Sequence, residues 1–331
     1  MLSRLPRISP RAYVYITLAA LVSLVVIILS GAAVRVTGSG LGCPTWPECN
    51  GAILQTELSS HAAIEYGNRL FTGIVSVCTI LAALCAFLRR PFRRDLAWLG
   101  LLLPLGVLLQ AGLGGLTVLY DLRPGFVMGH FLLSQLCVAA AFALYWRARH
   151  EPGERPRIAD RWAVWPVRGL LVFGGFVLFA GTVATGAGPH AGASGTGEVV
   201  ERLHFWGGGT AHKVIEWHGR AGTALLVLSV AIWLLLWRRG ANPDVRKAMT
   251  AVIGAICVQG AIGMWQYWVG VPAELVWFHV AAATATWLAL LWATATAGNL
   301  TPAREAAPAP AAQETPPATT AGPGPIPAGQ R

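Results

Sequence analysis

Charged side chains are scarce in this chain of 331 residues, because only 12% of them are Asp, Glu, Lys or Arg. A soluble domain carries about 25% charged residues, so half of the usual charge is missing. The apolar residues reach 55% of the chain and are arranged in runs long enough to cross a bilayer. This composition excludes an ordinary water-soluble globular protein and indicates an integral membrane protein.

Cysteine is also rare, with six residues spread along the chain, which excludes a small disulfide-stabilised scaffold. Only Cys43 and Cys49 lie close together outside an apolar run. Two cysteines on the oxidising side of a membrane favour a disulfide, which either braces its loop or takes part in thiol exchange. The sequence has no tight cluster of Cys, His and carboxylate residues of the kind that binds zinc.

Eight apolar segments are long enough to form transmembrane helices, because a hydrocarbon core of about 30 Å needs roughly 20 apolar residues per helix. The first of them is longer than the apolar region of a signal peptide, so we expect a retained helix there. The predicted fold class is therefore an all-α integral membrane protein. The eight segments cover residues 13–34, 64–88, 96–119, 126–146, 163–185, 214–237, 248–268 and 275–297.

The basic residues are distributed unevenly between the two ends of these segments. With the N-terminus inside, 19 of the 25 Lys and Arg residues lie on the inner side. This positive-inside distribution predicts a multi-pass protein of the cell membrane with both termini in the cytoplasm. The net charge of +10 is thereby explained by membrane orientation, and it gives no support for nucleic-acid binding.

The two halves of the chain resemble each other. Residues 110–114 recur as residues 259–263, and His130 recurs as His279, in both cases 149 positions further on. Such a repeat predicts two pseudo-symmetric four-helix bundles in parallel orientation. Residues 61–69 likewise match residues 212–220, which places His61, Glu65 and Arg69 opposite His212, Glu216 and Arg220.

The repeat and the changes of composition divide the chain into five parts. The tail after residue 298 is rich in Pro and Ala and has too few large apolar residues to fold, so we expect it to be disordered. The parts are a cytoplasmic N-terminal tail (1–12), a first four-helix half (13–148), a cytoplasmic linker (149–162), a second four-helix half (163–298) and a C-terminal tail (299–331).

Charged and titratable residues lie inside the apolar segments, where a charge costs about 2.5–3.5 kcal/mol. Spacing places Glu65, Asn68 and Arg69 on one helix face and predicts an ion pair between Glu65 and Arg69. Such a pair either holds helices together or provides a proton acceptor in a dry cavity. Histidines near the outer ends of neighbouring helices can clamp a flat metal macrocycle, although a single one is more simply a helix contact. Those histidines are His130, His218 and His279.

The most specific motif lies between the first two apolar segments. It reads Thr-Gly-Ser-Gly at 37–40 and Cys-Pro-Thr-Trp-Pro-Glu-Cys at 43–49, and Ile-Glu-Tyr-Gly-Asn-Arg follows at 64–69. With these motifs, residues 12–298 resemble the heme A synthase family. The resemblance implies an eight-helix membrane oxidoreductase of two similar halves. Such an enzyme oxidises the C8 methyl group of heme O to a formyl group by successive hydroxylations, which gives heme A for terminal oxidases.

The resemblance also implies roles for individual residues. A heme b cofactor, with its iron, is expected between His218 and His279 in the second half. Substrate heme O is expected in the first half on His130, and the family's catalytic glutamate falls on Glu65. Its ion-pair partner Arg69 is our own second catalytic candidate, which would hold Glu65 ionised or meet a heme propionate. The second substrate-binding histidine of the family falls on Asn68, which departs from the pattern because asparagine is a poor iron ligand. The repeat sets either Gly67 or Asn68 opposite His218, and His61, His212, Glu216 and Arg220 are secondary candidates.

The implied partners are the substrate heme O, the product heme A, the lipid bilayer, an electron acceptor, a heme O synthase, oxidase assembly factors and a second copy of the chain. Two other functions stay open on the residues alone. A membrane diheme b-type cytochrome that exchanges electrons with quinone would explain the histidines, but it predicts two axial histidines in each half. A transporter would suit a parallel repeat, but it predicts broken helices and polar residues at the midplane.

Overall fold

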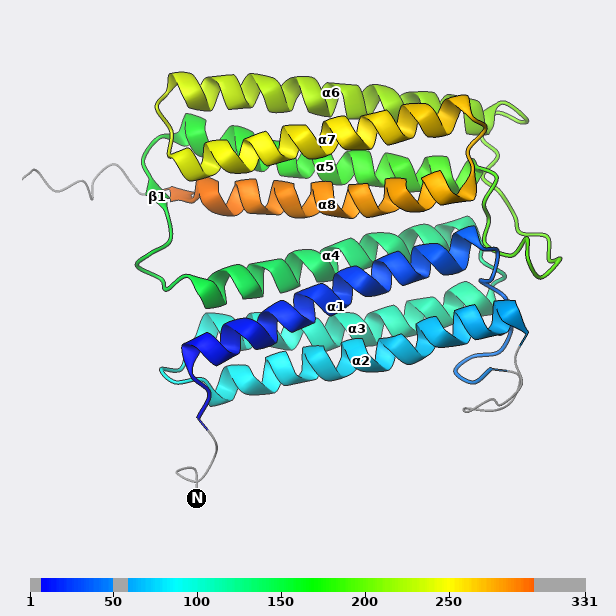
Figure 1. The fold of residues 1–331 in the computed structure, drawn as a ribbon, viewed down its shortest axis with the longest axis horizontal. Helices are drawn as coiled ribbons and strands as arrows, with labels where there is room; N and C mark the ends of the chain where they lie inside the picture. The colour runs from blue at the N-terminus through cyan, green and yellow to red at the C-terminus, as the bar shows by residue number, and fades with distance from the viewer. Residues whose placement is uncertain (1–6, 50–58, 301–331) are drawn as a thin grey trace, which may run out of the picture.

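The computed structural model describes residues 7–49 and 59–300, and eight long helices dominate it (Figure 1). Each of the eight is long and apolar enough to cross a membrane by length and composition. The all-α membrane fold expected from the sequence is confirmed. The helices are α1 (Pro10–Val36), α2 (Ser60–Leu88), α3 (Arg94–Leu119), α4 (Pro124–Arg149), α5 (Arg161–Ala187), α6 (Thr210–Arg238), α7 (Pro243–Trp268) and α8 (Ala273–Ala297).

Every helix begins a few residues before the apolar run that predicts it, because the first turns are built from polar caps and proline. Ser9 caps α1 by accepting a hydrogen bond from the amide of Ala12, and Pro10 occupies the first turn. The side chain of Asp160 caps α5 in the same way. Capping residues and N-terminal proline start a helix without adding to its apolar run, so the length of an apolar run underestimates the helix.

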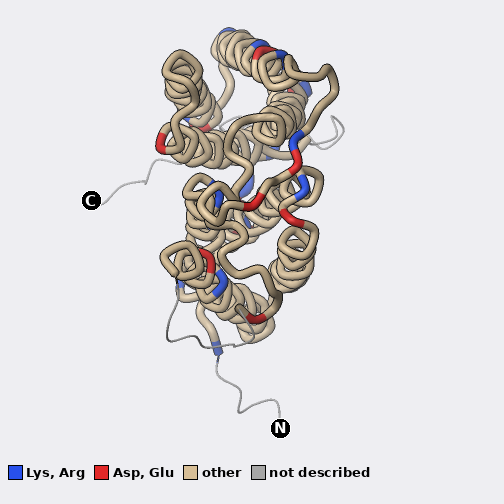
Figure 2. The backbone as a smooth tube through the Cα atoms, turned by 90° about the vertical axis from the view of Figure 1, so that its right-hand side faces the viewer, with Lys and Arg blue, Asp and Glu red and all other residues tan. Residues whose placement is uncertain are grey.

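The helices pack as two four-helix bundles, α1–α4 and α5–α8. Within each bundle, consecutive helices contact each other and the fourth helix returns to the first, which closes a ring of four. The two rings are separate groups when viewed from the end of the molecule (Figure 2). They meet along α1, α4, α5 and α8, which confirms the predicted pair of pseudo-symmetric bundles.

The turn between the third and fourth helix has the same unusual backbone in both halves. Leu122 and Val271, 149 residues apart, have φ angles of 55° and 61°. Their amides donate to the carbonyl oxygens of Thr117 at 2.9 Å and of Gln266 at 2.7 Å. A β-branched residue such as valine rarely adopts this left-handed conformation. Its recurrence at the same place therefore supports the duplication independently of the side chains.

Hydrogen bonds cross the seam between the bundles within the apolar spans. The indole nitrogen of Trp277 in α8 donates to the carbonyl oxygen of Leu29 in α1 at 2.9 Å. The indole nitrogen of Trp287 donates to the carbonyl oxygen of Gln135 in α4 at 3.1 Å, and the Gln135 amide donates to the hydroxyl of Thr284 at 3.3 Å. Specific polar contacts, in addition to apolar packing, thus join the two halves.

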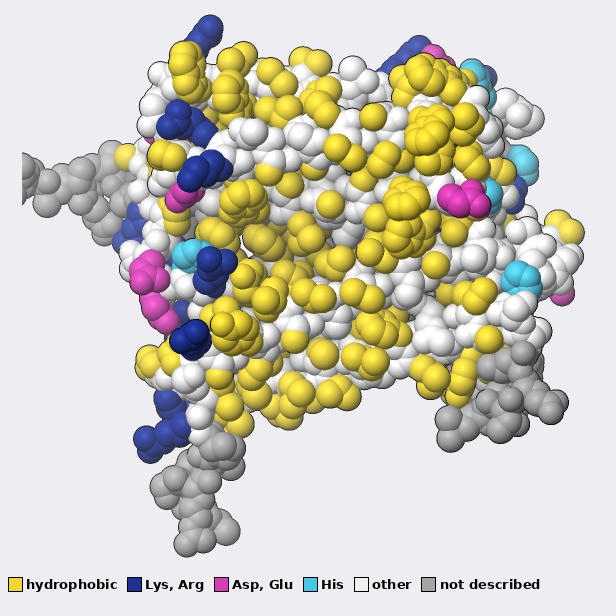
Figure 3. All heavy atoms as spheres, in the orientation of Figure 1, with side chains coloured by type: hydrophobic (Ala, Val, Ile, Leu, Met, Phe, Trp, Pro, Cys, Tyr) yellow, Lys and Arg dark blue, Asp and Glu magenta, His cyan; other side chains and the backbone are white. Residues whose placement is uncertain are grey.

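Basic side chains gather at the end of the molecule that carries the N-terminus (Figure 3). Arg89, which is fully buried, lies 2.6 Å from Glu151. Arg93 lies 2.8 Å from Asp95 and 3.3 Å from Glu151. These ion pairs fasten the turn between α2 and α3 to the linker that joins the halves.

A two-residue parallel ladder ties the linker to the end of α8. β1 (Arg157–Ile158) pairs with β2 (Asn299–Leu300). The segment expected to form the C-terminal tail therefore starts with two paired residues. Its remainder, residues 301–331, and residues 1–6 of the expected N-terminal tail lie outside the described residues.

Candidate functional site

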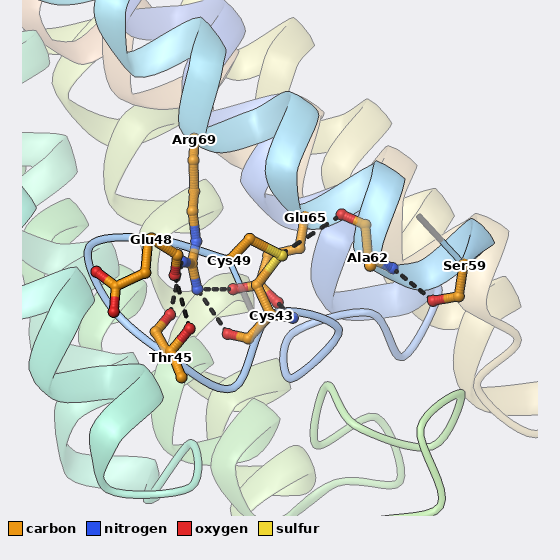
Figure 4. The surroundings of a disulfide bond; sticks show 8 residues. All are labelled: Cys43, Thr45, Glu48, Cys49, Ser59, Ala62, Glu65 and Arg69. Atoms are coloured by element: carbon orange, nitrogen blue, oxygen red, sulfur yellow. Dashed lines mark hydrogen bonds and ion pairs between the residues drawn. A yellow bond between two sulfur atoms is a disulfide. The ribbon is translucent and has the colours of Figure 1, made fainter. Parts of the chain in front are cut away.

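Glu65 and Arg69 hold a short loop against the start of α2 (Figure 4). Glu65 is 5% exposed, and its Oε1 lies 2.5 Å from Nη2 of Arg69, so the ion pair expected from the spacing is present. Its Oε2 accepts a hydrogen bond from the amide of Cys43 at 2.8 Å. Arg69 also donates to the carbonyl oxygens of Cys43 at 2.7 Å, Thr45 at 2.8 Å and Glu48 at 3.1 Å.

Cys43 and Cys49 form the predicted disulfide, with a Cα–Cα distance of 4.8 Å. Both cysteines are fully buried, and a buried disulfide is difficult for thiols to reach, which favours bracing over thiol exchange. The loop that they close carries Trp46, whose ring lies against Gly115 of α3. A Cβ atom at Gly115 would come within 2.7 Å of that ring. The braced loop therefore covers one end of the first bundle.

Three imidazoles lie against glycines of neighbouring helices. A Cβ atom added to any of these glycines would come within about 3 Å of the ring, so only glycine leaves room for the imidazole. The sequence did not reveal the role of these glycines, although Gly114 and Gly263 belong to the repeated segments 110–114 and 259–263. The pairs are His130 with Gly114 at 3.1 Å, His218 with Gly181 at 3.0 Å and His279 with Gly263 at 2.9 Å.

His218 of α6 and His279 of α8 face each other in the second bundle. Their ring centres are 6.1 Å apart and their planes are inclined by 76°. An ion with metal–nitrogen bonds of about 2 Å to two facing imidazoles keeps the ring centres about 6 Å apart. Gln259 of α7 lies 3.0 Å from Nε2 of His279, and the buried Nδ1 of His279 has no partner among the described residues. The pair therefore fits an iron bound by two imidazoles.

His212, the other candidate ligand in α6, lies apart from this pair. It is exposed, and its Nδ1 is 3.1 Å from the hydroxyl oxygen of Tyr267. The geometry therefore places His218, rather than His212, opposite His279.

His61 is engaged between the loops of the two halves. Its Nδ1 lies 2.8 Å from the hydroxyl of Ser39, and its ring packs closely against Gly195 in the connection between α5 and α6. These contacts assign His61 a role in loop packing.

The two Glu-Arg pairs that the sequence repeat aligns lie in different environments. Glu216 and Arg220 form an ion pair of 2.6 Å, but their side chains are 47% and 68% exposed, in contrast to the buried Glu65. The Glu-Arg pairs are 151 residues apart, whereas the side chains that enter the bundles, Asn68 and His218, are 150 apart. One residue of α-helix turns a side chain by about 100°. Similar sequences therefore present their acidic residues on different helix faces.

Asn68 takes the place in the first half that His218 takes in the second. Its Oδ1 accepts a hydrogen bond from the hydroxyl of Ser30 in α1 at 2.7 Å. Gly31, beside Ser30, is 150 residues before Gly181, but no atom lies within 4 Å of a Cβ atom placed there. The first half therefore has the glycine that corresponds to Gly181, but it has no imidazole beside that glycine.

Comparisons with known proteins agree on one family. The family model named COX15-CtaA, cytochrome oxidase assembly protein, matches residues 13–195. A protein of Lysinibacillus sphaericus named heme A synthase is 33% identical over 131 residues, which is 39% of this chain and 43% of that protein. A heme A synthase of Listeria monocytogenes (strain HCC23) is 32% identical over 126 residues, or 38% and 41%. The chain thus matches about two fifths of the length of these relatives. A heme A synthase of Exiguobacterium sp. is 25% identical over 245 residues, or 73% and 79%.

Proposed function

This chain belongs to the COX15-CtaA family of cytochrome oxidase assembly proteins, and from that premise we propose that it is a heme A synthase. The enzyme oxidises the C8 methyl group of heme O to a formyl group by successive hydroxylations and so makes heme A for terminal oxidases. The name of the relatives supports this activity. The observation that carries it within this chain is the facing pair His218 and His279, with ring centres 6.1 Å apart.

His218 and His279 would hold heme b in the second bundle. When bound, this group supplies one-electron redox chemistry. Gly181 and Gly263 provide the surfaces against which the two rings pack. The rings therefore keep their orientation through neighbours that have no contact with the iron.

The first bundle binds the substrate heme O through His130. Glu65 lies one turn before Asn68 on the same helix face and accepts a proton from the reacting methyl group or stabilises positive charge on the porphyrin. A carboxylate has about four lone-pair sites, so its bonds to Arg69 and to the Cys43 amide leave acceptor capacity. Arg69 forms the ion pair with Glu65 and holds the braced loop through three of its carbonyl oxygens.

The protein spans the cell membrane with both termini in the cytoplasm, as the gathering of basic side chains at one end supports (Figure 3). Its working partners are an electron acceptor, a heme O synthase that delivers the substrate, oxidase assembly factors that receive the product, and a second copy of the chain.

Coexpression with a heme O producer tests the function. We expect the purified protein to carry heme b together with heme O or heme A, and the membranes to accumulate heme A. Heme b alone would instead indicate the diheme cytochrome, and a protein without any heme would indicate a transporter. Either result, with no heme A in the membranes, would rule out the synthase.

Replacing Gly263 with alanine should weaken heme b binding by 10–100-fold, the range expected when a ligand loses its supporting contact. The new Cβ atom would lie 2.9 Å from the ring of His279 and would push it out of position. Alanine favours a helix by up to about 1 kcal/mol over glycine, so helix instability cannot cause the loss. The measurement is heme b per protein after purification. Gly260→Ala is the control, because nothing lies within 4 Å of that position.

A further inference from the structure

We propose that the heme iron in the first bundle is held by His130 alone, and that its opposite axial position, beside Asn68 and Ser30, is open to a small exogenous ligand. The inference rests on the proposed function, because it concerns the substrate heme. It makes the two bundles different in their iron chemistry although their folds are alike.

The two halves differ at one of four equivalent positions. Each of the three imidazoles packs on a glycine of the neighbouring helix, at 2.9–3.1 Å. The fourth position of this pattern has a glycine, Gly31, with no atom within 4 Å of a Cβ atom placed there. The residue opposite is Asn68, whose amide is shorter than an imidazole and bonds to Ser30 instead. Space for a ring is therefore present in the first bundle, and the ring is absent.

The second step is that Asn68 does not replace the imidazole as a ligand. Heme iron is bound axially by His, Cys, Met or Tyr side chains. The amide oxygen of Asn68 already accepts the hydrogen bond from Ser30 at 2.7 Å, so the amide group presents its N–H donors. Those donors can bind a polar ligand, but they cannot bind a metal.

The neighbouring side chains are committed to other contacts. The imidazole of His61 is bound to Ser39 and packed against Gly195. The carboxylate of Glu65 is held by Arg69 and by the Cys43 amide. Neither residue therefore fills the position opposite His130 without breaking these contacts.

The ligand class follows from the chemistry of iron held by a single imidazole. Such an iron takes water, dioxygen or carbon monoxide, and the Asn68 amide can donate a hydrogen bond to the oxygen of such a ligand. In the second bundle, by contrast, His218 and His279 face each other at 6.1 Å and would hold an iron from both sides.

Carbon monoxide binding to the full-length, heme-loaded protein tests the proposal. In the reduced wild-type protein we expect one carbon monoxide per two hemes, and a high-spin signal from the first-bundle heme in the oxidised state. Asn68→His should supply the missing imidazole on Gly31, convert that heme to low spin and lower carbon monoxide affinity at least tenfold. Asn68→Ala adds no ligand and is the matched control: the high-spin signal persists, and carbon monoxide still binds at one heme, although without the hydrogen bond from the amide.

The outcomes separate this proposal from the proposed function. The wild-type protein could make heme A while its first-bundle heme is low-spin and does not bind carbon monoxide. That result would contradict the open axial position and would still agree with heme A synthase activity. A protein that binds carbon monoxide at one heme but never makes heme A overturns the synthase alone. A protein that takes up no second heme overturns both. Because the wild type decides the main point, a folding defect in Asn68→His does not remove the test.

Discussion

His279→Ala should lose its heme b: we expect heme b affinity to fall by more than about 100-fold, and heme A formation to fall with it. Loss of a residue that only supports a metal ligand already costs about 10–100-fold in metal affinity, and His279 is proposed as the ligand itself. The cavity left on Gly263 offers no replacement, because Gln259, the neighbour of the ring, is a poor iron ligand. The measurement is the heme b spectrum per purified protein.

The control for this variant is His212→Ala on the same outer end of the second bundle. His212 is exposed and contacts Tyr267, so its loss should leave the heme b spectrum unchanged. If His212→Ala lost the heme and His279→Ala kept it, the assignment of axial ligands would be wrong. His218→Ala should behave as His279→Ala does, because the two rings face each other at 6.1 Å.

Glu65→Gln should lower the rate of heme A formation by about 100-fold or more, the contribution typical of a positioned proton acceptor, while leaving heme content unchanged. Glutamine has the shape of glutamate, and its amide oxygen can still accept the hydrogen bond from the Cys43 amide. Arg69 keeps its bonds to three carbonyl oxygens of the loop. The substitution therefore removes the charge and the proton acceptor with little disturbance of the loop. The assay is heme A formed per bound heme O.

The sequence repeat supplies the matched control, Glu216→Gln. The Glu216 carboxylate also forms an ion pair with an arginine one turn further along its helix, but its side chain is 47% exposed. Its removal should therefore change the rate of heme A formation little. Titration of free thiols would show whether the Cys43–Cys49 loop stays closed in each variant. If Glu65→Gln formed heme A at the normal rate with its loop closed, Glu65 would have only a structural role in holding the loop.

The parts of the structure that sequence predicted are those set by the length of apolar runs and by short spacings. Eight runs gave eight helices, and the spacing of Glu65 and Arg69 gave the ion pair. The proximity of Cys43 and Cys49 gave the disulfide. Each of these features depends on a few neighbouring residues, which a sequence displays directly.

The features that sequence missed depend on helix rotation and on contacts between distant segments. The repeat aligned Glu216 with Glu65, but a difference of one residue turns the two carboxylates to different faces. The packing of His61 against Gly195 joins residues more than 130 positions apart. The glycines beside the imidazoles were also not predicted, because the need for glycine at a position depends on which side chain packs against it.

The indole bonds across the seam have a mechanical consequence. Sliding one bundle along the other would separate Trp277 from Leu29 and Trp287 from Gln135, and an indole N–H that loses its partner in apolar surroundings costs free energy. The seam therefore resists the rocking by which paired bundles carry cargo from one side of a bilayer to the other. A fixed gap between the two proposed heme sites would suit the passage of electrons, because the rate of electron tunnelling falls steeply with distance.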